Sequence, residues 1–151
     1  MSPPPRSEVP RRLDARASSV EAPMQLNHID LQVPDVLEAA AFFERHFQFE
    51  VHGNRRSPAL AILTGPGDFT LVLQRRREAD VPYPEGFHIG FLVDDVATVY
   101  DKHAAIVAAG VDSGPVSEDG RGVMFYFKAP GDILVEVSCR RRPLPAARAG
   151  G

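Results

Sequence analysis

Two stretches of the chain, sixty positions apart, repeat the same order of apolar and polar residues. NHIDLQVPDV begins at Asn27 and FHIGFLVDDV begins at Phe87, with histidine, isoleucine, valine, aspartate and valine at matching positions. Successive side chains of a β-strand point to opposite faces. The alternation predicts two related strands, each with one apolar face and a histidine, His28 or His88, on the other.

A helical pattern follows each of these strands. In the first, apolar residues return every three or four positions, as on the buried side of a helix, and the second is rich in apolar residues over a similar length. They are Val36, Ala39, Ala40, Phe43 and Phe47 after the first strand, and Val96, Val99, Ala104, Ile106 and Val107 after the second. Asp35 and Asp95 directly precede the two patterns, where a carboxylate caps free amide groups, and Gly110 favours an end to the second helix. We therefore predict one capped helix in each half.

Each helix is followed by an extended stretch and then by a hairpin. The hairpins read ALAILTGPGDFTLVLQ and VMFYFKAPGDILVEVS, and both turn at a Pro-Gly-Asp corner, 66–68 and 130–132. Proline fixes φ and glycine accepts a left-handed conformation, so the dipeptide is a strong turn signal. The chain is thus predicted to be α+β, with two tandem βαβββ modules. A single helix does not cover both faces of a sheet, so we expect the modules to pack together.

Composition sets the boundaries of the folded part. Residues 1–23 contain five prolines, four arginines and no apolar periodicity, and we expect a disordered leader there. The paired arginines in it lack the apolar stretch that an export signal requires. We expect a single domain over 24–142, with module one at about 24–77 and module two at about 84–139. Residues 143–151 are expected to form a disordered tail.

Charge and cysteine content exclude several classes of protein. The formal net charge is −3, which does not suit a protein that binds a phosphate backbone through clustered positive charge. No apolar run approaches the roughly 20 residues that cross a bilayer. Cys139 is the single cysteine, so the chain forms no internal disulfide and contains no cysteine-rich metal site. We expect a cytoplasmic protein that binds a small molecule, with neither nucleic acid nor membrane as partner.

A duplicated βαβββ module with a histidine on the first strand of each half resembles the vicinal oxygen chelate superfamily. This superfamily includes glyoxalase I, bleomycin-resistance proteins, fosfomycin-resistance enzymes and extradiol dioxygenases. The resemblance covers roughly residues 24–139. It implies a cup-shaped mixed sheet with helices on its outer face. It also implies one divalent metal inside the cup, bound by residues on the first and last strands of each module.

The resemblance implies His28, His88 and Glu136 as metal ligands. Glu136 stands six positions after Pro130, and Val72 stands at the matching place after Pro66, so the fourth family position is apolar. Gln74 is a further possible ligand, two residues beyond Val72. Two imidazoles and a carboxylate suit Fe(II), Mn(II), Ni(II) or Zn(II). A lone strand histidine is more often structural, and a lone strand glutamate more often faces solvent, so the prediction depends on the three residues together.

Three residues are predicted to take part in chemistry. Glu136 interrupts an apolar run, and a carboxylate in such a strand must be paired, coordinated or hydrated. Tyr126 faces the cup if the apolar residues beside it face the helix, and its hydroxyl would then orient substrate or transfer a proton. Asp30, two residues beyond His28, would support a ligand or act as a base. For both Tyr126 and Asp30, a place in the lining or at the rim of the pocket is an equally open interpretation. Arg121 lies in a glycine-flanked loop, where flexible loop and anion contact are both open interpretations.

Several functions remain open at this point. The leading hypothesis is a metal-dependent enzyme that polarises a substrate with adjacent oxygen functions, as lyase, isomerase or dioxygenase. Glyoxalase I resembles the chain less, because one of its ligands would fall at Val72. One alternative is a metal-free binding protein of the bleomycin-resistance type. Another is a fosfomycin-type thiol transferase, suggested by the run SEDGRGVMFYFKAPGDILVEVS. We expect a homodimer, with ligands that meet either within one chain or across the interface.

Overall fold

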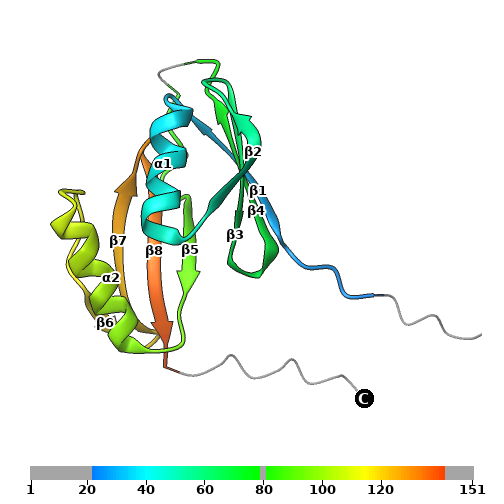
Figure 1. Ribbon diagram of the computed structural model, residues 1–151. Coiled ribbons are helices and arrows are strands. Elements are labelled where there is room, and N and C mark those ends of the chain that lie inside the picture. Colours follow the sequence, from blue (N-terminus) through cyan, green and yellow to red (C-terminus); the bar gives the residue numbers. More distant parts are fainter. Residues whose placement is uncertain (1–21, 79–80, 142–151) are drawn as a thin grey trace, which may run out of the picture.

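The computed structural model describes residues 22–78 and 81–141 and shows two modules with the same order of elements (Figure 1). The first consists of β1 (His28–Val33), α1 (Val36–Phe47), β2 (Glu50–Arg56), β3 (Leu60–Gly65), a short 3-10 turn (Pro66–Asp68) and β4 (Phe69–Arg75). The second consists of β5 (His88–Leu92), α2 (Val96–Ala108), β6 (Ser117–Asp119), β7 (Gly122–Ala129) and β8 (Ile133–Arg140). The predicted α+β class with two tandem βαβββ modules is confirmed.

The described strands form two four-stranded mixed sheets, in the orders β1-β4-β3-β2 and β5-β8-β7-β6. In each sheet the first strand lies at an edge and runs parallel to the last strand, while the remaining neighbours are antiparallel. The two sheets are equivalent in register, because Asp30 pairs with Val72 where Gly90 pairs with Glu136. Within one chain they stay separate and do not join into a single cup.

The corners of the two hairpins have the conformation that their sequence requires. Gly67 and Gly131 have φ of 71° and 90°, and the aspartates that follow, Asp68 and Asp132, both have φ of 59°. Two successive residues with positive φ make a tight reversal that matches the twist of the flanking strands. The Pro-Gly-Asp corners are therefore confirmed as turns in both modules.

Helix α1 forms as its pattern predicts. The side chain of Asp35 accepts a hydrogen bond from the backbone N of Glu38 at 2.9 Å, and the helix ends at Gln48 in a left-handed conformation. The five residues predicted to be buried are the five that the structure buries: Val36, Ala39, Ala40, Phe43 and Phe47. Aspartate is among the best capping residues, so the start of this helix is defined locally.

Helix α2 differs from the prediction. Asp95 caps it, with a 2.8 Å hydrogen bond from the backbone N of Thr98, but only Val99 and Ile106 are buried, and Val107 is 50% exposed. The reason lies in the first module. Phe47 of α1 stacks on Phe127 of β7 and covers part of the sheet that α2 would otherwise occupy.

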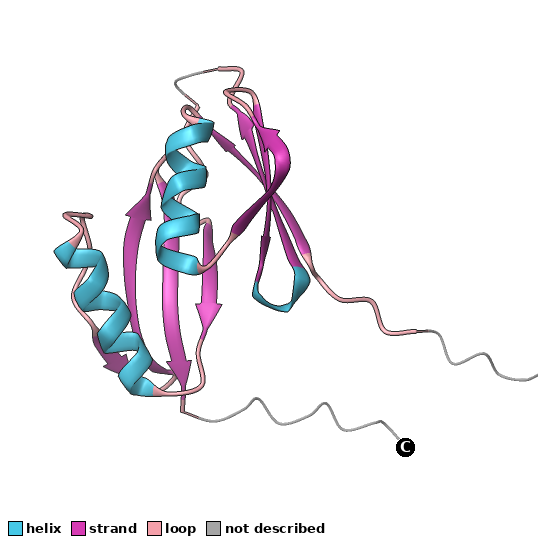
Figure 2. Cartoon of the chain, viewed as in Figure 1, coloured by secondary structure: helices cyan, strands magenta, loops and turns pink. Residues whose placement is uncertain are grey.

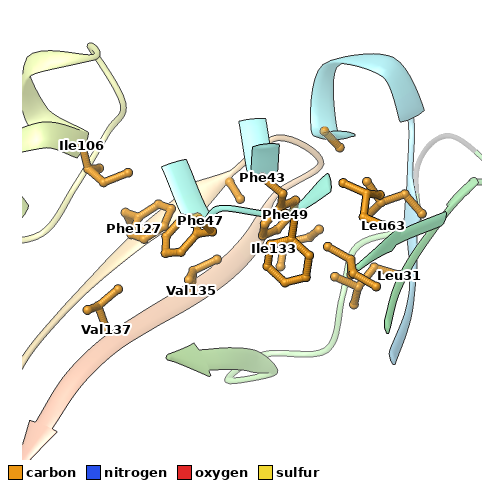
Figure 3. Close-up of a cluster of buried hydrophobic side chains, with 14 of the residues drawn as sticks. Leu31, Phe43, Phe47, Phe49, Leu63, Ile106, Phe127, Ile133, Val135 and Val137 are labelled. Atoms are coloured by element: carbon orange, nitrogen blue, oxygen red, sulfur yellow. The ribbon is translucent and has the colours of Figure 1, made fainter. Parts of the chain in front are cut away.

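One core joins the two modules, with α1 at its centre. In Figures 1 and 2, α1 lies between the two sheets, and α2 lies against β7 and β8. Each helix thus covers the apolar face of its own sheet, opposite the histidine. Figure 3 shows α1 phenylalanines between side chains of both sheets. The largest fully buried side chains come from both modules: Leu31, Phe43, Leu63, Leu71, Leu73, Ile106, Phe125, Phe127 and Ile133.

No helix in residues 22–78 and 81–141 is long and apolar enough to cross a membrane. The disordered leader and tail predicted for 1–23 and 143–151 fall almost entirely outside these described residues. They remain sequence predictions.

Candidate functional site

His88 and Glu136 come together on the open face of the second sheet. β5 runs parallel to β8, with His88 opposite Leu134 and Gly90 opposite Glu136. Gly90 adds no side chain between the two strands. Nε2 of His88 lies 3.4 Å from Oε2 of Glu136, and the carboxylate is half-buried.

The imidazole of His88 is oriented by the backbone. Its Nδ1 lies 2.9 Å from the carbonyl oxygen of Gly86, and since a carbonyl only accepts, Nδ1 carries the proton of this hydrogen bond. A neutral imidazole then has a lone pair on Nε2, which faces the carboxylate oxygen of Glu136. Two acceptors at 3.4 Å need a cation or a proton between them. This arrangement, with Nδ1 bonded to a carbonyl, is the usual one for a metal-binding histidine.

Tyr126 supports the carboxylate from the neighbouring strand. It pairs with Glu136 in the β7–β8 register, and its hydroxyl donates to Oε2 at 2.5 Å. The hydrogen bond to Glu136, with partial burial, raises the pKa of Tyr126. Burial alone would raise the pKa of Glu136, but the hydroxyl of Tyr126 and the charges nearby outweigh it and lower that pKa. Glu136 is thus held as an anion and Tyr126 as a neutral donor.

An open pocket of about 690 Å³ contains this pair. Its lining includes His88, Glu136, Ser138, Arg121, Met124 and Arg140. The guanidinium of Arg121 is fixed at the rim by Asp119, with Nη2 2.8 Å from Oδ2. The pocket therefore combines a nitrogen and an oxygen donor for a metal with a positively charged rim.

The first module carries its candidate residues on a different sheet. His28 pairs with Thr70 on β4, and Asp30 accepts hydrogen bonds from the amides of Gln32 and Gln74. Gln74, the possible fourth ligand, is therefore bonded to Asp30. Because α1 lies between the two sheets, β1, which carries His28, lies apart from β8, which carries Glu136 (Figure 1). Among the described residues, no three side chains of His, Cys, Asp or Glu gather to hold a metal.

Ser138 and Arg140 belong to the pocket, and sequence reasoning did not single them out. The signal was available in the alternation of β8, because residues two and four positions beyond Glu136 share its face. Ser138 is only 3% exposed. Its hydroxyl lies close enough to favour the charged form of Glu136, although no hydrogen bond of ordinary geometry joins them.

The residues of the pocket fit a divalent metal in donor type. One imidazole with its Nδ1 bonded to a carbonyl, and one carboxylate kept ionised, supply two protein ligands. His88 and Glu136 would hold the ion, and Tyr126 donates a hydrogen bond to the same carboxylate oxygen, Oε2, that faces His88. No third donor of the described residues joins the pair, so any further protein ligand would come from outside this pocket.

The fold and this pocket define a protein built from paired βαβββ modules with a candidate metal site on the open sheet. Residues 25–137 match the Glyoxalase/Bleomycin resistance protein/Dioxygenase superfamily. The chain belongs to this family. Among curated proteins, none matches the chain at a significant level.

Several solved structures share the fold. A possible glyoxalase from Bacillus cereus is 30% identical, with a TM-score of 0.69, over 78% of this chain and 100% of that one. Lactoylglutathione lyase from Agrobacterium tumefaciens is 22% identical, with a TM-score of 0.62, over 78% and 94%. A mutant of the fosfomycin resistance protein FosX from Listeria monocytogenes, complexed with Mn(II) and 1S,2S-dihydroxypropylphosphonic acid, is 21% identical, with a TM-score of 0.65, over 79% and 94%.

Proposed function

We propose that this protein is a divalent-metal-dependent enzyme whose metal is bound by His88 and Glu136 of one copy and His28 of a second copy. The observation that carries the proposal is the pair of facing acceptors, Nε2 of His88 and Oε2 of Glu136, 3.4 Å apart. With Nδ1 of the imidazole committed to Gly86, a divalent cation can satisfy both facing atoms, while Oε2 also accepts from Tyr126. Fe(II), Mn(II), Ni(II) and Zn(II) all accept this donor set.

The two edge strands support a shared site. β1 carries His28 and β5 carries His88, and each is the outermost strand at one edge of its sheet. An exposed edge is a ready template for another strand. Placing β1 of one copy beside β5 of another joins the two open faces and brings the three ligands to one cup. We therefore propose a homodimer in which each copy completes the site of the other.

Glu136, Tyr126 and Asp30 would each have a role beside the bound metal. A bound divalent ion supplies Lewis-acid polarisation of two adjacent substrate oxygens. Glu136 would hold negative charge beside it, and the hydroxyl of Tyr126, which donates to Oε2, the carboxylate oxygen that faces His88, would be near enough to orient substrate. Asp30 would reach the cup from the other copy with His28. These roles suit a small molecule with neighbouring oxygen functions as substrate.

The related structures support this class of reaction. One carries the name lactoylglutathione lyase, and another binds Mn(II) together with a compound that has two adjacent hydroxyl groups. The fold alone is shared with these proteins, so the choice between lyase, isomerase, dioxygenase and thiol transferase is left to the metal identity and to substrate trials. We also propose a cytoplasmic location, since the single thiol, Cys139, is buried and free.

Metal content tests the proposal directly. Full-length protein purified without added metal, and protein reconstituted with Zn(II) or Mn(II), is expected to retain about one ion per chain by elemental analysis. His28→Ala, His88→Ala and Glu136→Ala are each expected to lose most of it. His52→Ala, at an exposed histidine of β2, is the matched control and keeps the metal. A wild-type chain that retains no transition metal under either condition would contradict the proposal.

The alternative of metal-free binding is favoured by one observation, that one chain assembles only two donors among its described residues. A pocket of about 690 Å³ is large enough for a small ligand. In that case the three alanine variants would still bind the ligand of the wild-type protein with unchanged affinity. The metal-dependent proposal predicts that ligand affinity falls together with metal content in all three.

A further inference from the structure

Ser138 is a buried polar side chain whose hydroxyl favours the charged form of Glu136 without a hydrogen bond of ordinary geometry. It is 3% exposed, and its hydroxyl has no hydrogen-bond partner among the described residues. A buried hydroxyl without a partner is unfavourable, and such groups are retained in native proteins where something else satisfies them. Ser138 lines the same pocket as His88 and Glu136. Its hydroxyl is therefore available to a group that enters the pocket.

Strand β8 places three polar side chains in a row on this face. Glu136, Ser138 and Arg140 alternate with Val137 and Cys139, which are buried. Alternate residues of a strand are separated by about 6.6 Å along its axis. The row thus leads from the candidate metal ligand, past a hydroxyl donor, to a guanidinium at the end of the strand. Opposite Arg140 stands Gly122, which adds no side chain to the space.

The arginines at this end of the pocket differ in whether they form an ion pair. Arg121 is held by Asp119, and Arg141 is paired with Glu118. Among the described residues Arg140 forms no ion pair, although its side chain lines the pocket. A guanidinium only donates hydrogen bonds, and the serine hydroxyl beside it can donate one as well. Such a corner favours an acceptor with negative charge.

We infer that Ser138 and Arg140 form an anion subsite that selects substrates carrying a carboxylate or a phosphate group next to the adjacent oxygens held at Glu136. This inference rests on the proposed function for the position of those oxygens, and it adds the class of substrate. The anionic group accepts hydrogen bonds from the Ser138 hydroxyl and the Arg140 guanidinium, while the charge of Arg121 stays paired with Asp119. The substrate is a short organic anion, because the row from Glu136 to Arg140 spans only about 13 Å.

The subsite is tested by anion binding to the metal-free full-length protein. Sodium phosphate and sodium acetate are titrated separately, and the backbone amide NMR signals of residues 136–140 are followed. At least one of the two anions is expected to shift them saturably, and the tighter of the two identifies the anionic group. Ser138→Ala and Arg140→Ala are each expected to weaken that binding about tenfold, as for loss of a hydrogen bond to a charged group. Arg140→Lys retains part of it.

Two measurements separate this subsite from a structural role and from the metal site. Ser138→Ala removes an unpartnered buried hydroxyl, so its thermal midpoint is expected to equal or exceed that of the wild type while anion affinity falls. Arg45→Ala, an exposed arginine of α1, is the matched control and leaves anion binding unchanged. Zn(II) stoichiometry is expected to stay at the wild-type value in Arg140→Ala. Wild-type protein whose 136–140 signals respond to neither anion, or an Arg140→Ala variant with wild-type anion affinity, would overturn the inference without touching the metal proposal.

Discussion

Tyr126 is the residue through which the sheet acts on the candidate ligand Glu136. Its hydroxyl donates to Oε2 of the carboxylate at 2.5 Å, and its ring meets the imidazole of His88 edge to face, with centroids 5.9 Å apart. The tyrosine therefore restrains both side chains from one side of the pocket. Groups that hold a metal ligand in this way influence metal affinity nearly as much as the ligand itself.

Tyr126→Phe is accordingly expected to weaken Zn(II) binding by about tenfold, since loss of a group that orients a ligand costs 10- to 100-fold. The ring stays in place, so the thermal midpoint should change little. The measurement is competition against a chromophoric chelator. Tyr100→Phe, at an exposed tyrosine of α2, is the control and should bind Zn(II) like the wild type. Equal affinities in Tyr126→Phe and the wild type would show that this hydroxyl has no part in the site.

For single residues, the sequence predicts some of the candidate site but not the contacts between distant strands. Strand alternation is enough to place His88 and Glu136 on the face opposite the apolar one, because period two is a local property. The hydrogen bond between Gln74 and Asp30 joins two strands distant in sequence, and it depends on register that only the folded sheet defines. Ser138 is not predicted as a site residue, because a serine in an apolar strand is common and only the structure shows that its hydroxyl lacks a hydrogen-bond partner among the described residues.

Among the secondary structure elements, α2 begins at Asp95, a capping residue whose carboxyl group can be protonated. The backbone amide and the hydroxyl of Thr98 donate to the carboxylate of Asp95 and lower its pKa. A carboxyl group with a lowered folded-state pKa stabilises the fold above its unfolded pKa of about 3.9, and this stabilisation is lost as pH falls through the folded-state pKa. The cap therefore contributes to acid sensitivity.

Asp95→Asn keeps a good capping residue and removes the titration. The wild type is expected to have the higher thermal midpoint at pH 7, and the difference between the two proteins should shrink to near zero at about pH 2.5. Thermal unfolding between these values measures it. Asp94→Asn, which changes the neighbouring exposed carboxylate, should leave no such pH-dependent difference. A gap between wild type and Asp95→Asn that stays constant down to acid pH would contradict this account of the cap.

Helices differ in how far their sequence predicts their packing. The buried face of α1 follows from its apolar spacing because this face packs against its own sheet and, through Phe47, against the second. In α2 the same kind of pattern predicted Val96 and Val107 as buried, and both are exposed. The area that α2 covers is limited by α1, which arrives from the other module. That competition is a long-range effect and leaves no local signal.

For the molecule as a whole, Phe47 is the main junction between the modules. Its ring stacks on Phe91 of β5 with centroids 4.2 Å apart and on Phe127 of β7 at 5.9 Å, and Lys102 of α2 lies 4.9 Å from its centre. One side chain of the first module thus contacts two strands and a helix of the second. Large aromatic side chains at such positions contribute much of the energy that holds two units together.

Phe47→Ala is expected to lower the free energy of unfolding by about 3–5 kcal/mol, the usual range for a buried phenylalanine. Because the junction spans both modules, the variant is also expected to unfold in more than one transition. Urea denaturation followed by circular dichroism and by tyrosine fluorescence measures both effects. Leu37→Ala, at a 42% exposed leucine of α1, is the control and should cost less than about 0.5 kcal/mol. A Phe47→Ala protein as stable as Leu37→Ala would contradict this role.

The arrangement of the modules could not be predicted from sequence. Duplicated patterns and the corners at Gly67 and Gly131 predict two copies of one module, since each copy is determined by local spacing. How the copies pack depends on which of their faces meet, and the repeat is compatible with a site inside one chain or across two. In the structure α1 separates the sheets, so β1 with His28 lies apart from β8 with Glu136, and β1 and β5 each lie at the edge of their sheet.

The shared site is tested most directly by mixing two inactive variants. His28→Ala and His88→Ala are each expected to bind no metal. In a mixed dimer, one site loses both histidines while the other keeps His28 of one copy and His88 with Glu136 of its partner. After subunits are exchanged and excess Zn(II) is removed, the mixture should retain about one quarter of the wild-type metal, since half of randomly paired dimers are mixed and each has one intact site. A mixture that exchanges subunits and still binds no metal would contradict the account.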